Sequence, residues 1–550
     1  MATIKLDGRE IPFEKGETII QAAHRAGIDV PHYCWHPGLS APANCRMCLV
    51  EIAPAPGRAA LMLDVLGWDP VKREYVAQKK PKLQPACQVG CSDGMVVLSD
   101  TSPHVNQARA AVQEMLLLHH PVDCPICDQA GECRLQDYWL AHQRTGKRMH
   151  QEPVHKPKGV VFGPTIVYDA ERCILCTRCI RVCNEVAHDP VLDQRERGTF
   201  KEIVLSSNRQ LDHDYSLMTE HVCPVGALTS RHFRFKARVW FLRSGRTVCQ
   251  GCATGCNAYL DYDPRDDRPY RYRPRENPEV NRHWMCDEGM LSYPRATEGR
   301  LLSALVGDED ASLDEAMDEA KIQLRGHQEE PERMAFVLSA QHSLEDNFAL
   351  VTLARTFIQT RPSRAPGVPV ASRFFLARRR DGRADDVLMS RDKNPNVAGC
   401  LELVAPEPLR PLSELVDAVR KDEVRYVIAL GAEVDIDELE AKVELPQIKG
   451  LVVFASHEGP LTTAAHVALP VCCWAEEAGS YVNRDGRRQR AEAILRPRGD
   501  ARPAWELIAR LGRALGYAVE WTSPHDVARA LGACAPMGAT PPATASEAQP

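Results

Sequence analysis

The segment 120–133 reads His-Pro-Val-Asp-Cys-Pro-Ile-Cys-Asp-Gln-Ala-Gly-Glu-Cys, with its three cysteines at Cys124, Cys127 and Cys133. Three thiolates are one short of the four ligands that a [4Fe–4S] cubane needs. An imidazole is a chemically suitable fourth ligand for iron, and His120 precedes the first of these cysteines by about one helical turn. On the residues alone, His119 and Asp123 are alternatives. The segment therefore predicts an iron–sulfur site completed by a side chain other than cysteine.

Cysteine is also abundant on both sides of this segment. The 550-residue chain has 21 cysteines, and 17 of them lie between Cys34 and Cys286. In a reducing compartment such a density indicates metal binding rather than disulfides. Four others have no ligand spacing, and we expect them to be buried packing residues. These are Cys400, Cys472, Cys473 and Cys534.

Towards the N-terminus, one spaced cysteine and one Cys-x2-Cys pair are followed by a distant cysteine. The four are Cys34, Cys45, Cys48 and Cys87. This is the general pattern of a ferredoxin-type [2Fe–2S] site, in which the distant cysteine closes the loop around the cluster. Cys91 is the alternative to Cys87 as the fourth ligand. Zinc is the alternative metal, but a zinc knuckle could use two Cys-x2-Cys pairs and only one is present.

Towards the C-terminus, the spacing is that of bacterial ferredoxins. Two-cluster ferredoxins use the run Cys-x2-Cys-x2-Cys-x3-Cys-Pro, whose last cysteine serves the other cluster. Here the ligand positions before Cys223-Pro224 hold His213, Ser216 and Thr219 instead of cysteines. A single cubane is therefore expected, and Cys183, which ends the first run, is expected to be free. The predicted ligands are Cys173, Cys176, Cys179 and Cys223.

A fourth group of cysteines has the spacing Cys-x2-Cys-x3-Cys-x29-Cys. Its members are Cys249, Cys252, Cys256 and Cys286. Four cysteines at these intervals suit a third [4Fe–4S] cubane. Beyond Cys286 the pattern changes to short apolar runs and amphipathic segments, which are typical of an α/β domain with buried parallel strands.

The composition excludes several other classes of protein. A net charge of −6 argues against nucleic acid as a main partner, and the one basic run, at 378–380 and 383, is interpreted as a solvated loop. Because no stretch of 18 apolar residues and no signal segment is seen, we expect a cytoplasmic, unprocessed chain. The sequence shows no convincing Gly-x-Gly-x-x-Gly and no P-loop, so NAD and FMN are expected to bind elsewhere.

The order of the four groups and three local sequences carry a family resemblance. Residues 120–133, 172–179 and 223–229 closely resemble the large iron–sulfur subunit of bacterial respiratory complex I, an NADH:quinone oxidoreductase. Residues 284–289 and 475–487 resemble molybdopterin oxidoreductases. The likeness is strong over 1–290 and weaker over 290–530. It implies that His120 is an iron ligand, and that the chain holds one [2Fe–2S] and three [4Fe–4S] clusters but no molybdopterin.

The resemblance and the residues together predict a multidomain α+β and α/β protein. The Asp7-Gly8 turn, the strands around it and a helix over 18–26 fit a β-grasp. The expected domains are a β-grasp [2Fe–2S] ferredoxin-type domain (1–100), a [4Fe–4S] segment with one histidine and three cysteine ligands (101–145), a ferredoxin-like [4Fe–4S] domain (146–240), a molybdopterin-oxidoreductase-type cluster domain (241–300), a truncated, degenerate molybdopterin-oxidoreductase-like α/β domain (301–530) and a disordered tail (531–550). We also expect a polar surface insertion over 54–85 and a helix over 101–120 with Val112, Met115 and Leu116 on one face.

The function implied by the resemblance is an electron relay without an active site of its own. The chain would pass single electrons from a flavoprotein subunit that binds NADH and FMN towards quinone, together with other peripheral-arm subunits. It would lie on the cytoplasmic face of the inner membrane and touch the membrane only through the complex. Two alternatives remain open. One is an iron–sulfur subunit of an NAD-linked formate dehydrogenase or hydrogenase, and the other is a scaffold whose clusters only stabilise the fold.

Overall fold

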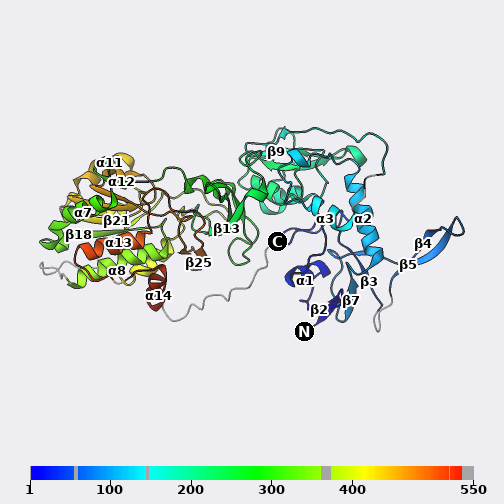
Figure 1. The fold of residues 1–550 in the computed structure, drawn as a ribbon, viewed down its shortest axis with the longest axis horizontal. Helices are drawn as coiled ribbons and strands as arrows, with labels where there is room; N and C mark the ends of the chain where they lie inside the picture. Colours follow the sequence, from blue (N-terminus) through cyan, green and yellow to red (C-terminus); the bar gives the residue numbers. More distant parts are fainter. Residues whose placement is uncertain are drawn as a thin grey trace. The chain divides into compact units, whose positions relative to one another are not determined.

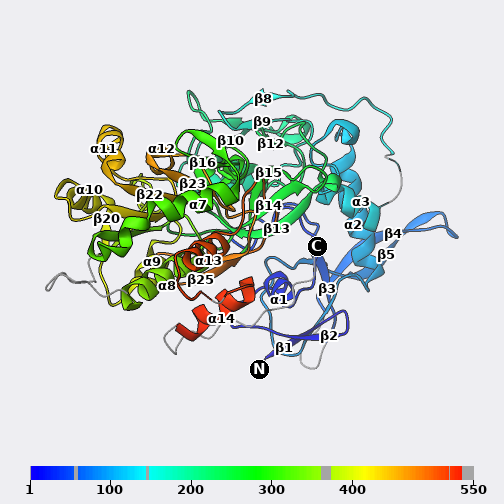
Figure 2. The same cartoon turned by 60° about the vertical axis from the view of Figure 1, so that its left-hand side comes forward.

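The structure, a computed structural model, describes residues 2–54, 60–143, 146, 148–360, 373–519 and 521–534. The chain forms two compact units, residues 1–242 and 243–550 (Figures 1 and 2). The predicted tail begins inside helix α14 (Pro524–Cys534), and its remaining residues, 535–550, lie outside the described part. Within the described residues, no helix is both long and apolar enough to cross a membrane.

The first unit begins with a five-stranded sheet in the order β2-β1-β7-β3-β6. The strands are β1 (Thr3–Leu6), β2 (Arg9–Pro12), β3 (Leu49–Ile52), β6 (Gln84–Pro85) and β7 (Met95–Leu98). Ile4 and Leu6 alternate along β1 into a core that Ile19 and Ile20 of α1 (Ile19–Arg25) cover. Thr18 and Gln21 close a capping box at the start of α1. The expected β-grasp arrangement is confirmed.

The insertion between β3 and β6 contains an arm of two antiparallel strands, β4 (Met62–Asp69) and β5 (Glu74–Pro81). The prediction of a surface segment is confirmed, but the arm is less polar than expected. One face of it exposes large side chains, among them Leu66, Trp68 and Tyr75. Trp68 and Tyr75 are cross-strand partners with ring centroids 5.3 Å apart. Both strands mix apolar residues with charged ones such as Asp64 and Lys79, so the overall composition of the insertion did not reveal this apolar face.

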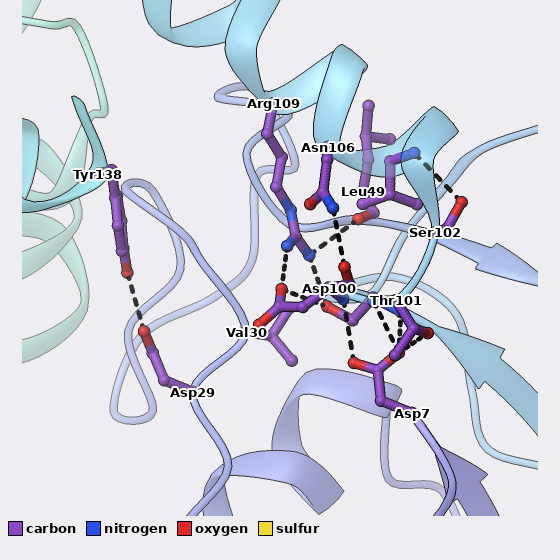
Figure 3. Close-up of polar contacts among 12 residues, drawn as sticks. Asp7, Asp29, Val30, Leu49, Asp100, Thr101, Ser102, Asn106, Arg109 and Tyr138 are labelled. Carbon is purple, nitrogen blue, oxygen red and sulfur yellow. Dashed lines mark hydrogen bonds and ion pairs between the residues drawn. The ribbon is translucent and has the colours of Figure 1, made fainter. Parts of the chain in front are cut away.

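The expected helix is α2 (Pro103–Leu117), but the face that it buries is not the one that carries Val112, Met115 and Leu116. Met115 is 70% exposed, whereas Val105, Arg109 and Gln113 are buried. Figure 3 shows Arg109 reaching from α2 towards Asp100 and Leu49, and its guanidinium also donates to Ser99 Oγ at 2.6 Å. Gln113 accepts from Tyr33 Oη and donates to the carbonyl of Leu135 at 2.9 Å. The hydrophobic pattern failed here because polar contacts attach this helix to its neighbours.

The remaining elements of the first unit surround two binding loops. A sheet in the order β12-β9-β8 joins β8 (Val160–Val161), β9 (Ile166–Tyr168) and β12 (Leu228–Ser230). Helix α4 (Arg178–Arg181) continues into a π-helical turn (Val182–Val186), and α5 (Ser216–His221) precedes the segment that leads to β12. A hairpin of β10 (Leu192–Arg195) and β11 (Glu202–Leu205) lies between this turn and α5 in the sequence. Helix α3 (Arg134–His142) comes earlier in the chain, after the cysteines of the segment 120–133. The loops that connect these short elements carry cysteines.

The second unit opens with a three-stranded antiparallel sheet and continues into a large α/β domain. The first sheet comprises β13 (Arg243–Val248), β14 (Asn257–Asp263) and β15 (Arg268–Pro274), and α6 (Asp287–Met290) follows. The large sheet has the order β17-β16-β23-β22-β21-β18-β19-β20. Its strands from β23 to β20 pair in parallel, and β16 and β17 add an antiparallel edge. The predicted buried parallel strands are therefore confirmed.

Strands and helices alternate along the sequence of the large domain. Its strands are β16 (Ala304–Val306), β17 (Glu309–Ala311), β18 (Met334–Ser339), β19 (Phe374–Ala377), β20 (Leu409–Pro411), β21 (Tyr426–Leu430), β22 (Gly450–Ala455) and β23 (Val467–Pro470), with a hairpin of β24 (Gly479–Val482) and β25 (Arg488–Ala491). Its helices are α7 (Leu313–Gln323), α8 (Leu344–Thr360), α9 (Val397–Val404), α10 (Leu412–Arg420), α11 (Glu438–Glu444), α12 (Pro460–Ala464) and α13 (Ala504–Ala514). Ser312 and Glu315 form the expected capping box of α7.

Helices cover both faces of this sheet. Phe336 and Leu338 of β18 pack with residues of α7, α8 and α13, whereas Ala335 and Val337 pack with residues of α10, α11 and α12. Strands that are buried on both faces must be apolar at every position, which is why they read as continuous hydrophobic runs. Cys400 lies fully buried in α9, as its lack of ligand spacing suggested.

Candidate metal centres

Site one is formed by the loop 34–48 and the residues that follow β6. The Sγ atoms of Cys48 and Cys87 are 3.5 Å apart. The thiols of Cys34 and Cys45 are hydrogen-bonded to each other, which raises the pKa of Cys34 and lowers that of Cys45 to about 5. The backbone of the loop turns through left-handed conformations at Ala43 and Arg46. The structure thus brings the four predicted ligands of this site together in two close pairs.

Cys91, the alternative fourth ligand, is engaged elsewhere. Its backbone N–H donates to the carbonyl of Glu17 at 2.8 Å, and partial burial raises the pKa of its thiol to about 11. The charges that act on this thiol are those of Glu17 and Arg25, not those of the other cysteines. The geometry therefore favours Cys87 over Cys91.

Site two is a cavity of about 590 Å³ beside the end of α2. His120, Cys124, Cys127 and Cys133 all line it, together with apolar side chains such as Trp139 and Leu140. Burial and the nearby Arg172 lower the pKa of His120 to about 4, so its imidazole is neutral near pH 7. Its Nδ1 is buried and has no hydrogen-bond partner among the described residues. A neutral imidazole with an unused nitrogen is the form that binds a metal.

The two alternatives to His120 have other partners. Nδ1 of His119 accepts a hydrogen bond from the backbone N–H of Val154 at 3.2 Å. Asp123 pairs with Lys158 at 2.7 Å and with Arg172 at 3.0 Å. Although Asp123 also borders the cavity, these two cations already neutralise its carboxylate. The geometry therefore favours His120 as the histidine of this site.

Site three is a cavity of about 10 Å³ that the four predicted cysteines share with Tyr168. The cysteines are Cys173, Cys176, Cys179 and Cys223. Leu175 and Thr177 adopt positive φ angles of 55° and 63°, which curve the binding loop. Burial raises the pKa of Cys173 to about 11, so the binding of a metal has to displace its proton.

Cys183 lies apart from this cavity. Its Sγ is 3.4 Å from Nε2 of His213, which occupies one of the ligand positions missing from the second ferredoxin run. Ser216 and Thr219 occupy the other two, and their hydroxyls donate to the carbonyls of His213 and Ser216. Hydrogen bonds within the chain thus fill the place where a second ferredoxin cluster would bind.

Site four lies in the second unit, in a cavity of about 10 Å³ that Cys249, Cys252, Cys256 and Cys286 line. Backbone N–H groups of Gly251 and Gly289 lie 3.4 Å from Sγ of Cys249 and Cys286 respectively. A Cβ at Gly289 would come 3.0 Å from the Cys249 sulfur, so a side chain there would push this sulfur out of place by a few tenths of an ångström. Hydrogen bonds to sulfur are one of the features by which a protein tunes a cluster.

These sites are clusters of thiols around cavities rather than tight coordination spheres. Among the described residues, no three His, Cys, Asp or Glu side chains are arranged to hold a single metal ion. The residues nevertheless fit iron–sulfur clusters, because each cubane site offers four suitable donors around one space and site one offers four thiols in two close pairs.

Residues shared between sites were not predicted from the sequence. Arg172 directly precedes Cys173 of site three and also lines the cavity of site two. Val225 and Ala227 line site three, whereas Gly226 between them lines site two. The position of Arg172 within the quoted segment 172–179 was the one available signal. Tertiary contacts alone show that sites two and three are neighbours.

The second unit also contains a small polar cavity of about 20 Å³, bordered by Gln250, Asp346, His457 and Glu477. This volume accommodates one or two water molecules. The basic run at 378–383 is only partly the solvated loop that we expected: Arg383 is exposed, but Arg378 pairs with Asp381 and Asp392, and Arg379 donates to the carbonyl of Gln250. Neighbouring carboxylates and carbonyls make burial of these guanidinium groups possible.

Comparisons with known proteins agree with the order of the sites. Residues 1–102 match a 2Fe-2S iron-sulfur cluster binding domain, and 109–148 match the NADH-ubiquinone oxidoreductase-G iron-sulfur binding region. Residues 163–229 match the ferredoxin-like domain of NADH-quinone oxidoreductase subunit 3, and 398–514 match molybdopterin oxidoreductase. The G subunit of the NADH-quinone oxidoreductase of Streptomyces coelicolor is 33% identical over 393 residues, which cover 70% of this chain. The chain is homologous to the G subunits of NADH-quinone oxidoreductase.

Other relatives differ in length and in degree of likeness. The chain spans 43% of the Streptomyces G subunit, less than half of that relative. The NADH-ubiquinone oxidoreductase 78 kDa subunit of Candida albicans is 28% identical over 97% of this chain and 85% of its own. A crystal structure of an NAD+-reducing [NiFe]-hydrogenase aligns at 27% identity over 43% of this chain and 91% of that one, with a TM-score of 0.35.

Proposed function

We propose that this G-subunit homologue is an iron–sulfur electron-relay subunit of an NADH:quinone oxidoreductase. It would pass single electrons from a flavoprotein subunit, which binds NADH and FMN, towards quinone. We assign a [2Fe–2S] cluster to site one and a [4Fe–4S] cluster to each of sites two, three and four. Bound clusters would supply one-electron oxidation and reduction, and the chain's own residues would hold and space them.

The observation that carries this proposal is the chain of contacts through the first unit. Arg181 donates to the carbonyls of Cys34 in site one and Cys176 in site three. Gly226 and Arg172 in turn link site three to site two. A protein whose clusters only stabilise the fold would not need the ligand sets of three sites to be linked by such contacts. An electron relay does need short separations between its clusters. The order that these contacts support is site one, site three, site two.

Site two has the features of an exit. Its cavity is far larger than those of sites three and four, and its surroundings expose Val122, Ile126 and Leu140. We infer that a peripheral-arm subunit with its own redox centre docks over this apolar rim. The complex would lie on the cytoplasmic face of the inner membrane, and this chain would touch the membrane only through its partners.

Anaerobic reconstitution with iron and sulfide tests the proposal. Cluster stoichiometry predicts about fourteen irons per chain, and EPR spectroscopy should separate the [2Fe–2S] signal from the [4Fe–4S] signals. The isolated chain should not oxidise NADH, because no nucleotide-binding motif is seen in its sequence. After addition of the flavoprotein subunit, NADH should reduce the clusters. Stoichiometric zinc, or NADH oxidation by the chain alone, would reject the proposal.

A further inference from the structure

Two buried arginines lie between site one and site three. Arg178 and Arg181, on the short helix α4 of site three, are only 6% and 8% exposed. Arg178 donates to the carbonyls of Trp35 and Val222, which are the direct neighbours of Cys34 and Cys223. Arg181 donates to the carbonyls of Cys34, Ser40 and Cys176. Each guanidinium therefore joins the binding loop of one site to that of the other.

The contacts of these arginines are with neutral oxygen atoms. In the described part of the chain, no carboxylate oxygen lies within 4 Å of either guanidinium, and the Nε atoms of both are buried without a hydrogen-bond partner. The carboxylate of Glu185, whose charge acts on Arg181, accepts hydrogen bonds from the backbone N–H and the hydroxyl of Ser40 instead. Burying a cation is costly unless an opposite charge compensates for it.

We propose that Arg178 and Arg181 are positioning residues that supply the counter-charge shared by the clusters of sites one and three. This inference rests on the proposed function. Clusters held by four thiolates carry net negative charge, which is the compensation that both guanidinium groups lack within the protein. Because Arg is effectively always protonated, the charge is permanent.

Two consequences follow for electron transfer. A nearby positive charge stabilises the form that has gained an electron, so both arginines raise the midpoint potentials of the two clusters. Because each guanidinium borders both sites, it stays next to the electron before and after the electron moves from site one to site three. The hydrogen bonds also clamp the loop of Cys34 against that of Cys176, and Asn44 Nδ2 adds a contact to the carbonyl of Leu175 at 3.5 Å. The pair would thus set both the potential and the spacing.

The test is an EPR-monitored redox titration of the full-length chain, reconstituted anaerobically with iron and sulfide. Arg178→Gln and Arg181→Gln should each shift the midpoint potentials of the site-one and site-three clusters to more negative values, at the iron content of the unmodified chain. The site-two potential should not move. Arg181→Lys, which keeps the charge, should shift the two potentials less than Arg181→Gln. Arg209→Gln is the matched control, because Arg209 is half-exposed and paired with Asp189 at 2.7 Å.

The outcomes separate this inference from the proposed function. Unmodified chain without [2Fe–2S] and [4Fe–4S] signals would overturn both. Unchanged potentials in fully loaded Arg178→Gln and Arg181→Gln chains would overturn the counter-charge alone. If Arg181→Gln takes up no iron, Arg178→Gln and Arg181→Lys still test the counter-charge. Equal potentials in Arg178→Gln and the unmodified chain would contradict it. A shift of the site-three potential in Arg209→Gln as large as the shifts in these two variants would also contradict it.

Discussion

Gly226 lies directly against Cys127, although 98 residues separate them in the sequence. A Cβ built on Gly226 would come 2.2 Å from the Sγ of Cys127, well inside van der Waals contact. The segment that carries Cys223 of site three therefore passes so close to site two that no side chain fits. This close approach is the reason for a glycine at this position, since its φ is not in the left-handed region.

Gly226→Ala should therefore damage site two selectively. The added methyl group would push Cys127 away from its position, and we expect a loss of the site-two [4Fe–4S] signal and of about four irons per chain. EPR spectra and iron analysis measure the effect. Gly532→Ala is the control, because a Cβ at Gly532 would meet nothing within 4 Å. A Gly226→Ala chain with all its iron and an unchanged site-two spectrum would show that the contact is unimportant.

Replacement of His120 should change the properties of site two more than replacement of its neighbour. His120→Cys would substitute a negatively charged thiolate for a neutral imidazole, so the midpoint potential of the site-two cluster should become more negative. His120→Ala should lower its occupancy. His119→Ala should do neither, because Nδ1 of His119 accepts from Val154. Redox titration with EPR detection decides, and equal effects at positions 119 and 120 would contradict the ligand assignment.

Cys183 and Cys179 should respond differently to the same substitution. Cys179 lines the cavity of site three, so Cys179→Ser should abolish the site-three spectrum. Cys183 contacts His213 instead, so Cys183→Ser should leave that spectrum intact and cost only about 1 kcal/mol in the free energy of unfolding. The two variants form a matched pair only four residues apart. Loss of the spectrum in both would mean that Cys183 is a ligand.

Removal of the arm should not affect the [2Fe–2S] module. None of the core residues of that module comes from β4 or β5, and the backbone N–H of Lys82 donates to the carbonyl of Leu61 at 2.7 Å, so the two ends of the arm are adjacent. A short turn in place of residues 62–81 should preserve the visible spectrum and the thermal midpoint of cluster loss. A large drop in either would mean that the arm supports the cluster loop.

Acid should weaken the second unit in a window set by His457. Burial lowers the pKa of this imidazole to about 4, and the positive charges of Arg295 and Arg300 lower it further. The hydrogen bond to the Arg295 carbonyl and the charge of Glu433 raise the pKa, but they do not outweigh burial. As the pH falls from about 6.5 to about 4, the unfolded imidazole takes up a proton that the folded one resists. This contribution to stability is therefore fully present above that window and is lost within it, by roughly 3 kcal/mol.

Denaturant unfolding followed across this pH range measures the loss. His457→Gln should flatten the part of the pH dependence between about 6.5 and 4. The exposed His525→Gln is the control and should leave the curve unchanged. An identical pH dependence in the His457→Gln and unmodified chains would show that other groups govern the acid response.

The grouping of the cysteines could be predicted from the sequence because most of the ligands of one site share a short loop. The spacing of Cys173, Cys176 and Cys179 sets which thiols can face one space, and the cavity of site three contains these three. The same holds for the parallel strands: a strand buried on both faces must be apolar throughout, and 426–430 reads so. Local chemistry and local periodicity were enough for these features.

Only the tertiary structure showed which residues connect the sites. The preference for Cys87 over Cys91, already drawn from the sequence, is supported by the position of the residues after β6 beside the loop of Cys48. Helix α2 buries Arg109 because Asp100, Leu49 and Ser99 lie there to satisfy its guanidinium. Arg181 reads as an ordinary surface residue until the fold places the carbonyls of Cys34 and Cys176 around it. Hydrogen bonds and charge compensation between segments far apart in sequence leave no periodic trace, so folding alone brings them together.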